Sequence, residues 1–182
     1  ILGDNFFYGQ GFTNRLKTAL HNNEGATIFT YIVNNPSDYG ILEIDRRNKI
    51  KKIVEKPSRP KSNLAITGLY FFNHEVVNFA KKLKPSKRNE LEIIDLLKIY
   101  LKNGLLKSVF LGRGSAWLDT GNASNLFNAS QYIAVMEERQ GLKIACIEEI
   151  SYQNKWISKK QILERINFYG RCAYSEYLKK II

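Results

Sequence analysis

Hydrophobic and polar residues follow two different periods along the chain, and these periods predict strands and helices in turn. Apolar residues spaced by four predict a helix over residues 11–22, and comparable patterns predict helices over 75–83, 92–103, 122–139, 157–166 and 174–182. Runs rich in β-branched and aromatic residues predict strands over 26–33, 40–45, 50–55, 64–72 and 106–111. Residues 1–4 are interpreted as the tail of a further strand.

This alternation of strands and helices is typical of an α/β layered sheet. We expect a single domain over residues 1–182, within which residues 141–182 form a subregion of helices and short strands. Ligands of such sheets bind beyond the carboxyl ends of strands, and Asp4 is predicted at such an end. The chain begins inside what should be a core strand, so we expect it to be part of a larger protein.

The composition is that of a globular protein, with 44% hydrophobic and 12% aromatic residues. No apolar run approaches the roughly 20 residues needed to span a bilayer. Cys146 and Cys172 fit no metal-binding or redox spacing, which favours reduced thiols in a cytoplasmic protein. The net charge of +11 is compatible with nucleic-acid binding, but the lysines are scattered over separate elements. We therefore expect neither nucleic acid nor a membrane as a partner.

Two aspartates in glycine-flanked settings are the first candidates for chemistry. Asp4 follows Ile-Leu-Gly, and Asp119 precedes Thr-Gly. Both follow short apolar runs, which predicts that each lies at the end of a buried strand. Two carboxylates that converge on one spot would hold a hard divalent cation, which next to basic residues suggests phosphate chemistry. An isolated aspartate after a strand is more often a cap or turn residue, so the interpretation depends on whether the two meet.

A second candidate is the sequence Glu55-Lys56-Pro57. A glutamate accepts hydrogen bonds from hydroxyls, and a lysine supplies a compact positive charge for a phosphate. Adjacent residues of a strand point to opposite faces, so both can face one ligand only where the strand ends. Pro57 predicts that it ends there. The alternative is an exposed ion pair in front of a loop.

Further candidates are single residues. Arg88 belongs to a basic loop, and it is either exposed to solvent or clamps a phosphate with its planar fork of donors. Gly40 and Gly68 are expected to be required by the backbone, and each could also expose a backbone N–H or C=O group to a ligand.

Six short motifs occur in a familiar order: Leu2-Gly3-Asp4-Asn5, Tyr39-Gly40, Glu55-Lys56-Pro57, Thr67-Gly68-Leu69-Tyr70, Glu90-Leu91-Glu92-Ile93 and Trp117-Leu118-Asp119-Thr120-Gly121. With these motifs the chain resembles the glucose-1-phosphate thymidylyltransferases, which are short bacterial sugar nucleotidyltransferases, over essentially all of its length. The resemblance implies a Rossmann-like layered mixed sheet of the nucleotide-diphospho-sugar transferase type, incomplete at its N-terminal side. It also implies a homotetramer and a role in deoxysugar supply, such as rhamnose for surface polysaccharide.

The implied reaction joins dTTP and glucose 1-phosphate into dTDP-glucose and pyrophosphate. By the resemblance, Asp4 and Asp119 hold Mg²⁺, and Lys56 and Arg88 bind the sugar phosphate, so these four are the implied catalytic residues. The implied substrate pocket consists of Asn5, Tyr39, Gly40, Glu55, Lys56, Ile66, Tyr70, Arg88 and Trp117. A regulatory nucleotide site near a subunit interface is implied for Tyr8, Gly9, Arg113, Glu149 and Ile150.

The sequence departs from the resemblance in one respect. The family's glycine-rich loop, which holds the triphosphate, has no counterpart here, because no Gly-x-Gly-x-x-Gly or Walker-type segment occurs. We therefore expect weak or no nucleotidyl transfer by these 182 residues alone. Three alternatives stay open: a related enzyme that uses UTP, CTP or ATP, a non-catalytic module for sugar-phosphate binding or assembly, and a basic nucleic-acid binder.

Overall fold

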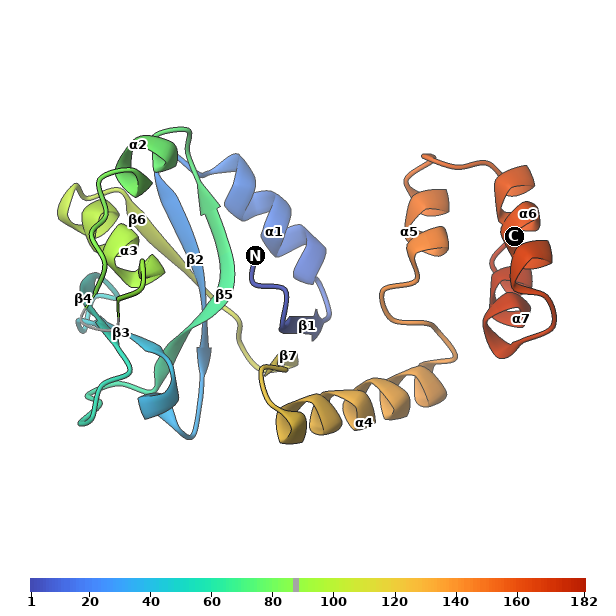
Figure 1. Cartoon of the computed structure of the whole chain (residues 1–182), viewed down its shortest axis with the longest axis horizontal. Coiled ribbons are helices and arrows are strands. Elements are labelled where there is room, and N and C mark those ends of the chain that lie inside the picture. Colours follow the sequence, from blue (N-terminus) through green and yellow to red (C-terminus); the bar gives the residue numbers. More distant parts are fainter. Residues whose placement is uncertain (87–88) are drawn as a thin grey trace. The chain divides into compact units, whose positions relative to one another are not determined.

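The computed structural model describes residues 1–86 and 89–182, which divide into two compact units (Figure 1). Unit 1 comprises Ile1–Asn122 and contains every strand of the described chain, whereas unit 2, Ala123–Ile182, is helical. The mixed sheet and its helices confirm the α/β fold class. The single domain expected over residues 1–182 stays a prediction.

A five-stranded mixed sheet forms the body of unit 1. Its strands have the order β4–β3–β5–β2–β6. Strand β2 pairs antiparallel with β5 and parallel with β6, and its residues 26–30 are buried. A strand covered on both edges and both faces has no solvent-facing side to be polar, which explains why this run shows little alternation even though Thr27 and Thr30 are among its buried residues. The bounds are β2 Ala26–Ile32, β3 Gly40–Ile44, β4 Ile50–Glu55, β5 Leu64–Phe72 and β6 Leu106–Phe110.

Helices cover the two faces of this sheet. Ile28 and Phe29 are neighbours on β2 and point to opposite faces. Ile28 packs with Leu97 of α3 (Ile93–Lys102), and Phe29 packs with Ala19 of α1 (Phe12–His21). Figure 1 accordingly shows α1 on one side of the sheet, with α3 and the short α2 (Val76–Ala80) on the other. These helices and the five strands confirm the sequence predictions to within a few residues at their ends.

The β3–β4 hairpin confirms the predicted turn. The Oδ1 atom of Asp45 accepts hydrogen bonds from the backbone N–H groups of Arg47 at 2.8 Å and Lys49 at 3.0 Å. Asn48 has a φ of 60°, in the left-handed region that asparagine tolerates. The hydrogen bonds from Lys49 and Arg47 hold the pKa of Asp45 below its usual value.

The prediction for residues 1–4 is wrong. These residues form a turn, which the backbone N–H of Asn5 closes by donating to the carbonyl of Leu2 at 3.3 Å. The apolar pair that suggested a buried strand is exposed instead, by 80% for Ile1 and 49% for Leu2. The strand begins only after the turn, so Asp4 precedes a strand rather than ending one.

That strand, β1 (Asn5–Gly9), forms a separate two-stranded sheet with β7 (Ser115–Asp119). The pairing is antiparallel, and Asn5 lies opposite Asp119 while Gly9 lies opposite Ser115. Asp119 is the last residue of β7, as predicted. The sequence did not predict β1, because its residues Phe6, Phe7 and Tyr8 show no apolar–polar alternation.

Unit 2 consists of four helices, α4 Ala123–Gln140, α5 Ile147–Gln153, α6 Lys159–Tyr169 and α7 Ala173–Lys180. Ile162 and Ile166 of α6 pack with Tyr177 and Leu178 of α7 and with Cys146. The short strands expected within residues 141–182 are absent from this unit, so that part of the prediction is wrong. The apolar residues of this segment are spaced by four, which is a helical period.

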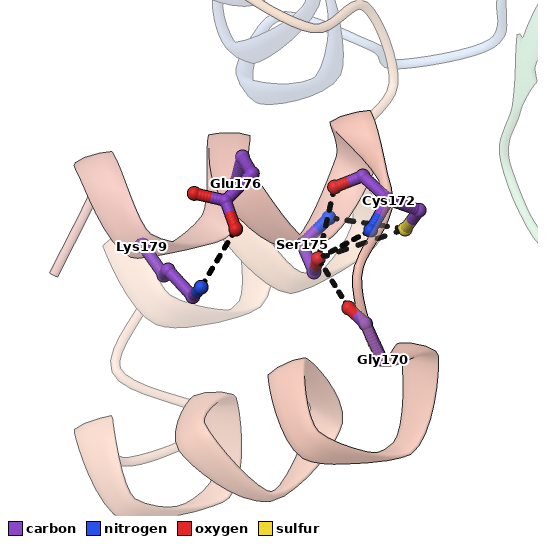
Figure 2. A network of polar contacts seen from close by, with 5 residues as sticks. All are labelled: Gly170, Cys172, Ser175, Glu176 and Lys179. Carbon is purple, nitrogen blue, oxygen red and sulfur yellow. Dashed lines mark hydrogen bonds and ion pairs between the residues drawn. The ribbon is translucent and has the colours of Figure 1, made fainter.

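The start of α7 shows how a buried hydroxyl organises a helix end (Figure 2). Ser175 is fully buried, and its Oγ lies 2.5 Å from the carbonyl oxygen of Gly170 and 2.9 Å from that of Cys172. The backbone N–H of Cys172 donates back to the Ser175 hydroxyl at 3.1 Å. The Ser175 hydroxyl thereby links Gly170, which follows α6, to Cys172, the N-cap residue of α7.

Both cysteines carry free thiols, and Cys146 is buried whereas Cys172 is exposed. Within the described residues, no helix combines the length and the apolar character required to traverse a bilayer.

Candidate active site

Ten of the predicted catalytic and substrate-binding residues line one hollow of about 220 Å³ in unit 1. Larger hollows of about 410 and 510 Å³ exist elsewhere in this unit, and none of the predicted site residues that the structure describes lines them. Arg88 lies outside the described residues. The lining of the smaller hollow includes the predicted residues Asp4, Asn5, Tyr39, Gly40, Glu55, Lys56, Ile66, Tyr70, Trp117 and Asp119.

Strand pairing brings Asp4 next to Asp119. Asn5 begins β1 opposite Asp119, the last residue of β7. Beyond the pair, Thr120 donates to the carbonyl oxygen of Asp4 from its backbone N–H at 2.7 Å and from its hydroxyl at 2.8 Å. These bonds fix two segments that are far apart in the sequence at the place where both carboxylates emerge.

The two carboxylates converge on Gly121. Oδ1 of Asp119 lies 3.1 Å, and Oδ2 of Asp4 lies 3.3 Å, from the position that a Cβ atom on Gly121 would take. Such hard oxygen donors fit Mg²⁺, which is usually bound through one or two carboxylates together with water and phosphate oxygens. Among the described residues, no group of three or more histidine, cysteine, aspartate or glutamate side chains could hold a metal ion. A pair of carboxylates would suit a cation that is shared with a phosphate substrate.

Asn5 links this carboxylate pair to the sheet. Its Nδ2 donates to Oδ1 of Asp4 at 2.9 Å. Its Oδ1 accepts from the indole Nε1–H of Trp117 at 2.7 Å and from the backbone N–H of Gly68 at 2.9 Å. The Asn5 amide thus contacts β5 and β7 and one of the two carboxylates.

Two glycines leave room for polar side chains at the hollow. A Cβ on Gly68 would lie 2.6 Å from Oδ1 of Asn5, closer than non-bonded atoms approach. A Cβ on Gly40 would lie 2.7 Å from Cδ1 of Ile94 and 3.1 Å from Oε2 of Glu55. Both positions therefore need glycine because of close side-chain neighbours, whereas the sequence led us to expect a requirement of the backbone.

Glu55 and Lys56 both line the hollow, as predicted for a strand end. Strand β4 ends at Glu55, and Lys56 has a φ of 39°, a left-handed conformation that breaks the alternation of the strand. The backbone N–H of Lys56 donates to the carbonyl of Tyr39 at 3.0 Å. This pairing holds Lys56 and Tyr39 at the same edge of the hollow.

Two tyrosines at the hollow have raised pKa values. Burial, and then the charge of Glu55, raise the pKa of Tyr70 to about 12. Burial also raises the pKa of Tyr39, followed by the charges of Asp119 and Asp38. Both phenols stay protonated at neutral pH and can donate hydrogen bonds to a polar ligand.

Gly68, a candidate of the sequence analysis, lines the hollow too, and four lining residues were not among the candidates: Leu2, Asp38, Ile93 and Ile94. The two isoleucines begin α3, and their apolar character predicts a core position equally well. Asp38 belongs to the short 3-10 helix Pro36–Asp38 in front of Tyr39. Its position directly before the Tyr39-Gly40 motif was the available signal.

The predicted regulatory residues belong to different units. Tyr8 and Gly9 lie on β1, and Arg113 lies in the loop before β7. Glu149 and Ile150 lie on α5 of unit 2, where Glu149 Oε2 accepts from the hydroxyl of Tyr177 at 2.5 Å. A regulatory nucleotide site formed by these residues stays a prediction.

Solved structures show which class of protein has this fold. A UDP-glucose pyrophosphorylase in complex with UDP-glucose matches 72% of the chain with a TM-score of 0.64 at 22% identity. A candidate glucose-1-phosphate thymidylyltransferase from Bacillus anthracis, solved in complex with sucrose, matches 72% of the chain with a TM-score of 0.62 at 37% identity. The matched parts amount to 54% of the pyrophosphorylase chain and 52% of the Bacillus anthracis chain. The fold is that of the nucleotide-diphospho-sugar transferases.

The sequence comparisons define the family. The model of the family described as Nucleotidyl transferase matches residues 1–135, which include all residues that line the hollow. The chain belongs to the nucleotidyl transferase family. It is 47% identical over 182 residues to glucose-1-phosphate thymidylyltransferase of Neisseria gonorrhoeae and 40% identical over 182 residues to that of Mycobacterium tuberculosis. It spans 63% of the length of each of these relatives.

Proposed function

We propose that the protein containing this chain is a glucose-1-phosphate thymidylyltransferase. The observation that carries the proposal is the convergence of Asp4 and Asp119 on one point, within a hollow that also presents Glu55 and Lys56. The relatives that bear this activity in their names support it. The products of the reaction would be dTDP-glucose and pyrophosphate.

The reaction is an in-line displacement at phosphorus. A phosphate oxygen of glucose 1-phosphate attacks the α-phosphorus of dTTP, a new P–O bond forms, and the bond to the β-phosphate breaks with release of pyrophosphate. Asp4 and Asp119 would hold Mg²⁺, which neutralises phosphate charge when it is bound. Lys56 would bind the sugar phosphate, and the same role is proposed for Arg88.

The remaining lining residues would orient the sugar. Glu55 accepts hydrogen bonds from sugar hydroxyls, while Gly40 and Ile66 form the wall. Tyr70 keeps its proton at neutral pH, since its pKa of about 12 lies far above 7, so its hydroxyl can donate to a sugar oxygen. Catalysis then consists of positioning and charge neutralisation, without a covalent enzyme intermediate.

The test is pyrophosphate release with dTTP, glucose 1-phosphate and Mg²⁺, measured on the protein in its full natural length. Asp119→Asn should lower kcat by about 100-fold or more, because a charge that faces the reacting phosphates is lost. Circular dichroism should show an unchanged fold. Asp95→Asn is the matched control, since Asp95 lies on the exposed side of α3 and pairs with Lys98. A normal rate for Asp119→Asn would remove Asp119 from the site.

The 182-residue chain should show weak or no transfer by itself, since it contains no glycine-rich triphosphate loop. Robust turnover by this chain would contradict that expectation. Base preference is part of the proposal as well, and comparison of dTTP, UTP, CTP and ATP as substrates decides it. The proposal also includes a homotetramer in the cytoplasm and a regulatory nucleotide site. Sedimentation with and without nucleotide measures the oligomeric state and any effect of nucleotide on it.

A further inference from the structure

The hydrogen bonds around Asn5 determine which end of its amide faces Asp4. The indole Nε1–H of Trp117 and the backbone N–H of Gly68 can only donate. Both point at the same Asn5 atom, at 2.7 and 2.9 Å. That atom must therefore be the amide oxygen, and the NH₂ group is left to face Asp4, where Nδ2 lies 2.9 Å from Oδ1.

We propose that Trp117 is a positioning residue that acts through Asn5 to orient the carboxylate of Asp4. This inference rests on the proposed function, in which Asp4 and Asp119 share a cation. The Asn5 amide occupies Oδ1 of Asp4, and Oδ2 is the oxygen directed towards the point shared with Asp119. If the amide turned over, its oxygen would face the carboxylate, and the two would repel each other.

The indole of Trp117 is held firmly enough to serve this purpose. Its side chain is almost completely buried in a cluster with Ile41 and Ala65. The rings of Tyr39 and Tyr31 contact it, with centroids 5.1 and 6.1 Å away. Such packing leaves the ring one orientation, so its N–H has a fixed direction. A phenylalanine at this position would fill most of the space and would lack the donor.

The first experiment measures divalent-cation binding with Mn²⁺ as the probe, followed by the electron paramagnetic resonance of the free ion. Trp117→Phe should weaken binding at the Asp4-dependent site by about 3- to 10-fold, the effect of one lost hydrogen bond. Trp156→Phe is the matched control, because Trp156 lies in unit 2 and is 71% exposed. It should bind as the wild type does.

A double-mutant cycle separates positioning from packing. In an Asn5→Ala background, Trp117→Phe should change Mn²⁺ affinity by less than about twofold, because the residue through which Trp117 acts is already missing. Full additivity of the two substitutions would show that Trp117 acts by packing alone and would overturn the proposal. Wild-type affinity in Trp117→Phe would overturn it as well.

The second experiment needs neither a variant nor a metal. In a ¹⁵N-labelled wild-type protein, the indole N–H of Trp117 should exchange with solvent on the order of tenfold more slowly than that of Trp156. Equal exchange rates would refute the hydrogen bond to Asn5. The proposed function would instead be refuted if the wild type had no Mn²⁺ site that depends on Asp4, as judged against Asp4→Asn, and also showed no nucleotidyl transfer. The two failures are thus distinguishable.

Discussion

Alanine at position 68 tests how closely β5 must approach Asn5. The added Cβ would lie 2.6 Å from Oδ1 and 2.7 Å from Cγ of Asn5, and 2.9 Å from Cβ of Leu2. The φ of Gly68 is not in the left-handed region, so the alanine itself meets no backbone strain. The cost comes from the neighbours, since Asn5 must move and thereby loses the N–H of Gly68.

The expected loss in the free energy of unfolding is about 1–3 kcal/mol, the range for an extra methyl group in a tightly packed site. Part of this loss is offset, because any Gly→Ala change restricts the unfolded chain and contributes roughly 0.4–1 kcal/mol of stability. Gly3→Ala is the matched control, since a Cβ there meets no atom within 4 Å. It shares the effect on the unfolded chain, and the difference between the two variants isolates the steric term.

Urea unfolding of both variants provides the measurement, followed by fluorescence and circular dichroism. Gly68→Ala should also weaken Mn²⁺ binding, because the displaced Asn5 no longer faces Asp4 correctly, whereas Gly3→Ala should leave it unchanged. Equal unfolding midpoints for the two variants would show that Asn5 and Leu2 adapt without cost. The close approach of β5 would then not position the site.

Two further predictions concern single side chains. Ser175→Ala should lower the stability of unit 2 by about 1–3 kcal/mol in urea unfolding, because it removes a buried hydroxyl bonded to Gly170 and Cys172. Ser130→Ala, on the exposed side of α4, should be neutral, and an equal effect of both would contradict the role of Ser175. The difference between the alkaline absorbance titration curves of the wild type and of Tyr70→Phe should have a midpoint at about pH 12, because burial and then the charge of Glu55 raise the pKa of Tyr70. The stability that the neutral phenol contributes is then complete below the unfolded pKa of about 10 and is lost as the pH rises towards the folded pKa. A midpoint at the unperturbed value would refute the burial of this hydroxyl at the site.

The five strands of the main sheet were predictable because each has a local signal. Strand β2 is a run rich in β-branched and aromatic residues, and β3 and β4 alternate around the turn at Asn48. β7 had a signal in the apolar run before Asp119, but β1 and its pairing with β7 had none, since the partners are far apart in sequence and β1 carries three aromatic residues in a row. Asp4 was predicted at the wrong end of a strand, because the apolar residues Ile1 and Leu2 suggested a strand before it and belong to an exposed turn instead.

The candidate site was predictable through its motifs and not through periodicity. Asp4, Lys56 and Asp119 were selected by their local sequence, and the fold decides whether they meet. The hydrogen bonds of Asn5 could not be predicted, because its partners Gly68 and Trp117 become neighbours only through the packing of β5 against the β1–β7 pair. Local patterns contain no information on such contacts.

Glycines at the hollow are required for a reason that differs from the usual one. At Gly40, Gly68 and Gly121, a Cβ would meet Glu55, Asn5 and Asp119, at 3.1, 2.6 and 3.1 Å from the nearest side-chain oxygen. None of the three has a left-handed φ, whereas Gly104 and Gly114 do and have open space around them. Alanine at the latter two positions strains only the backbone. Alanine at the first three crowds a polar side chain, and at position 40 it also meets Ile94 at 2.7 Å, so its effect should appear in ligand and cation binding as well as in stability. Gly40, Gly68 and Gly121 are therefore part of the site, because they set the distance between the backbone and the polar groups that the hollow presents.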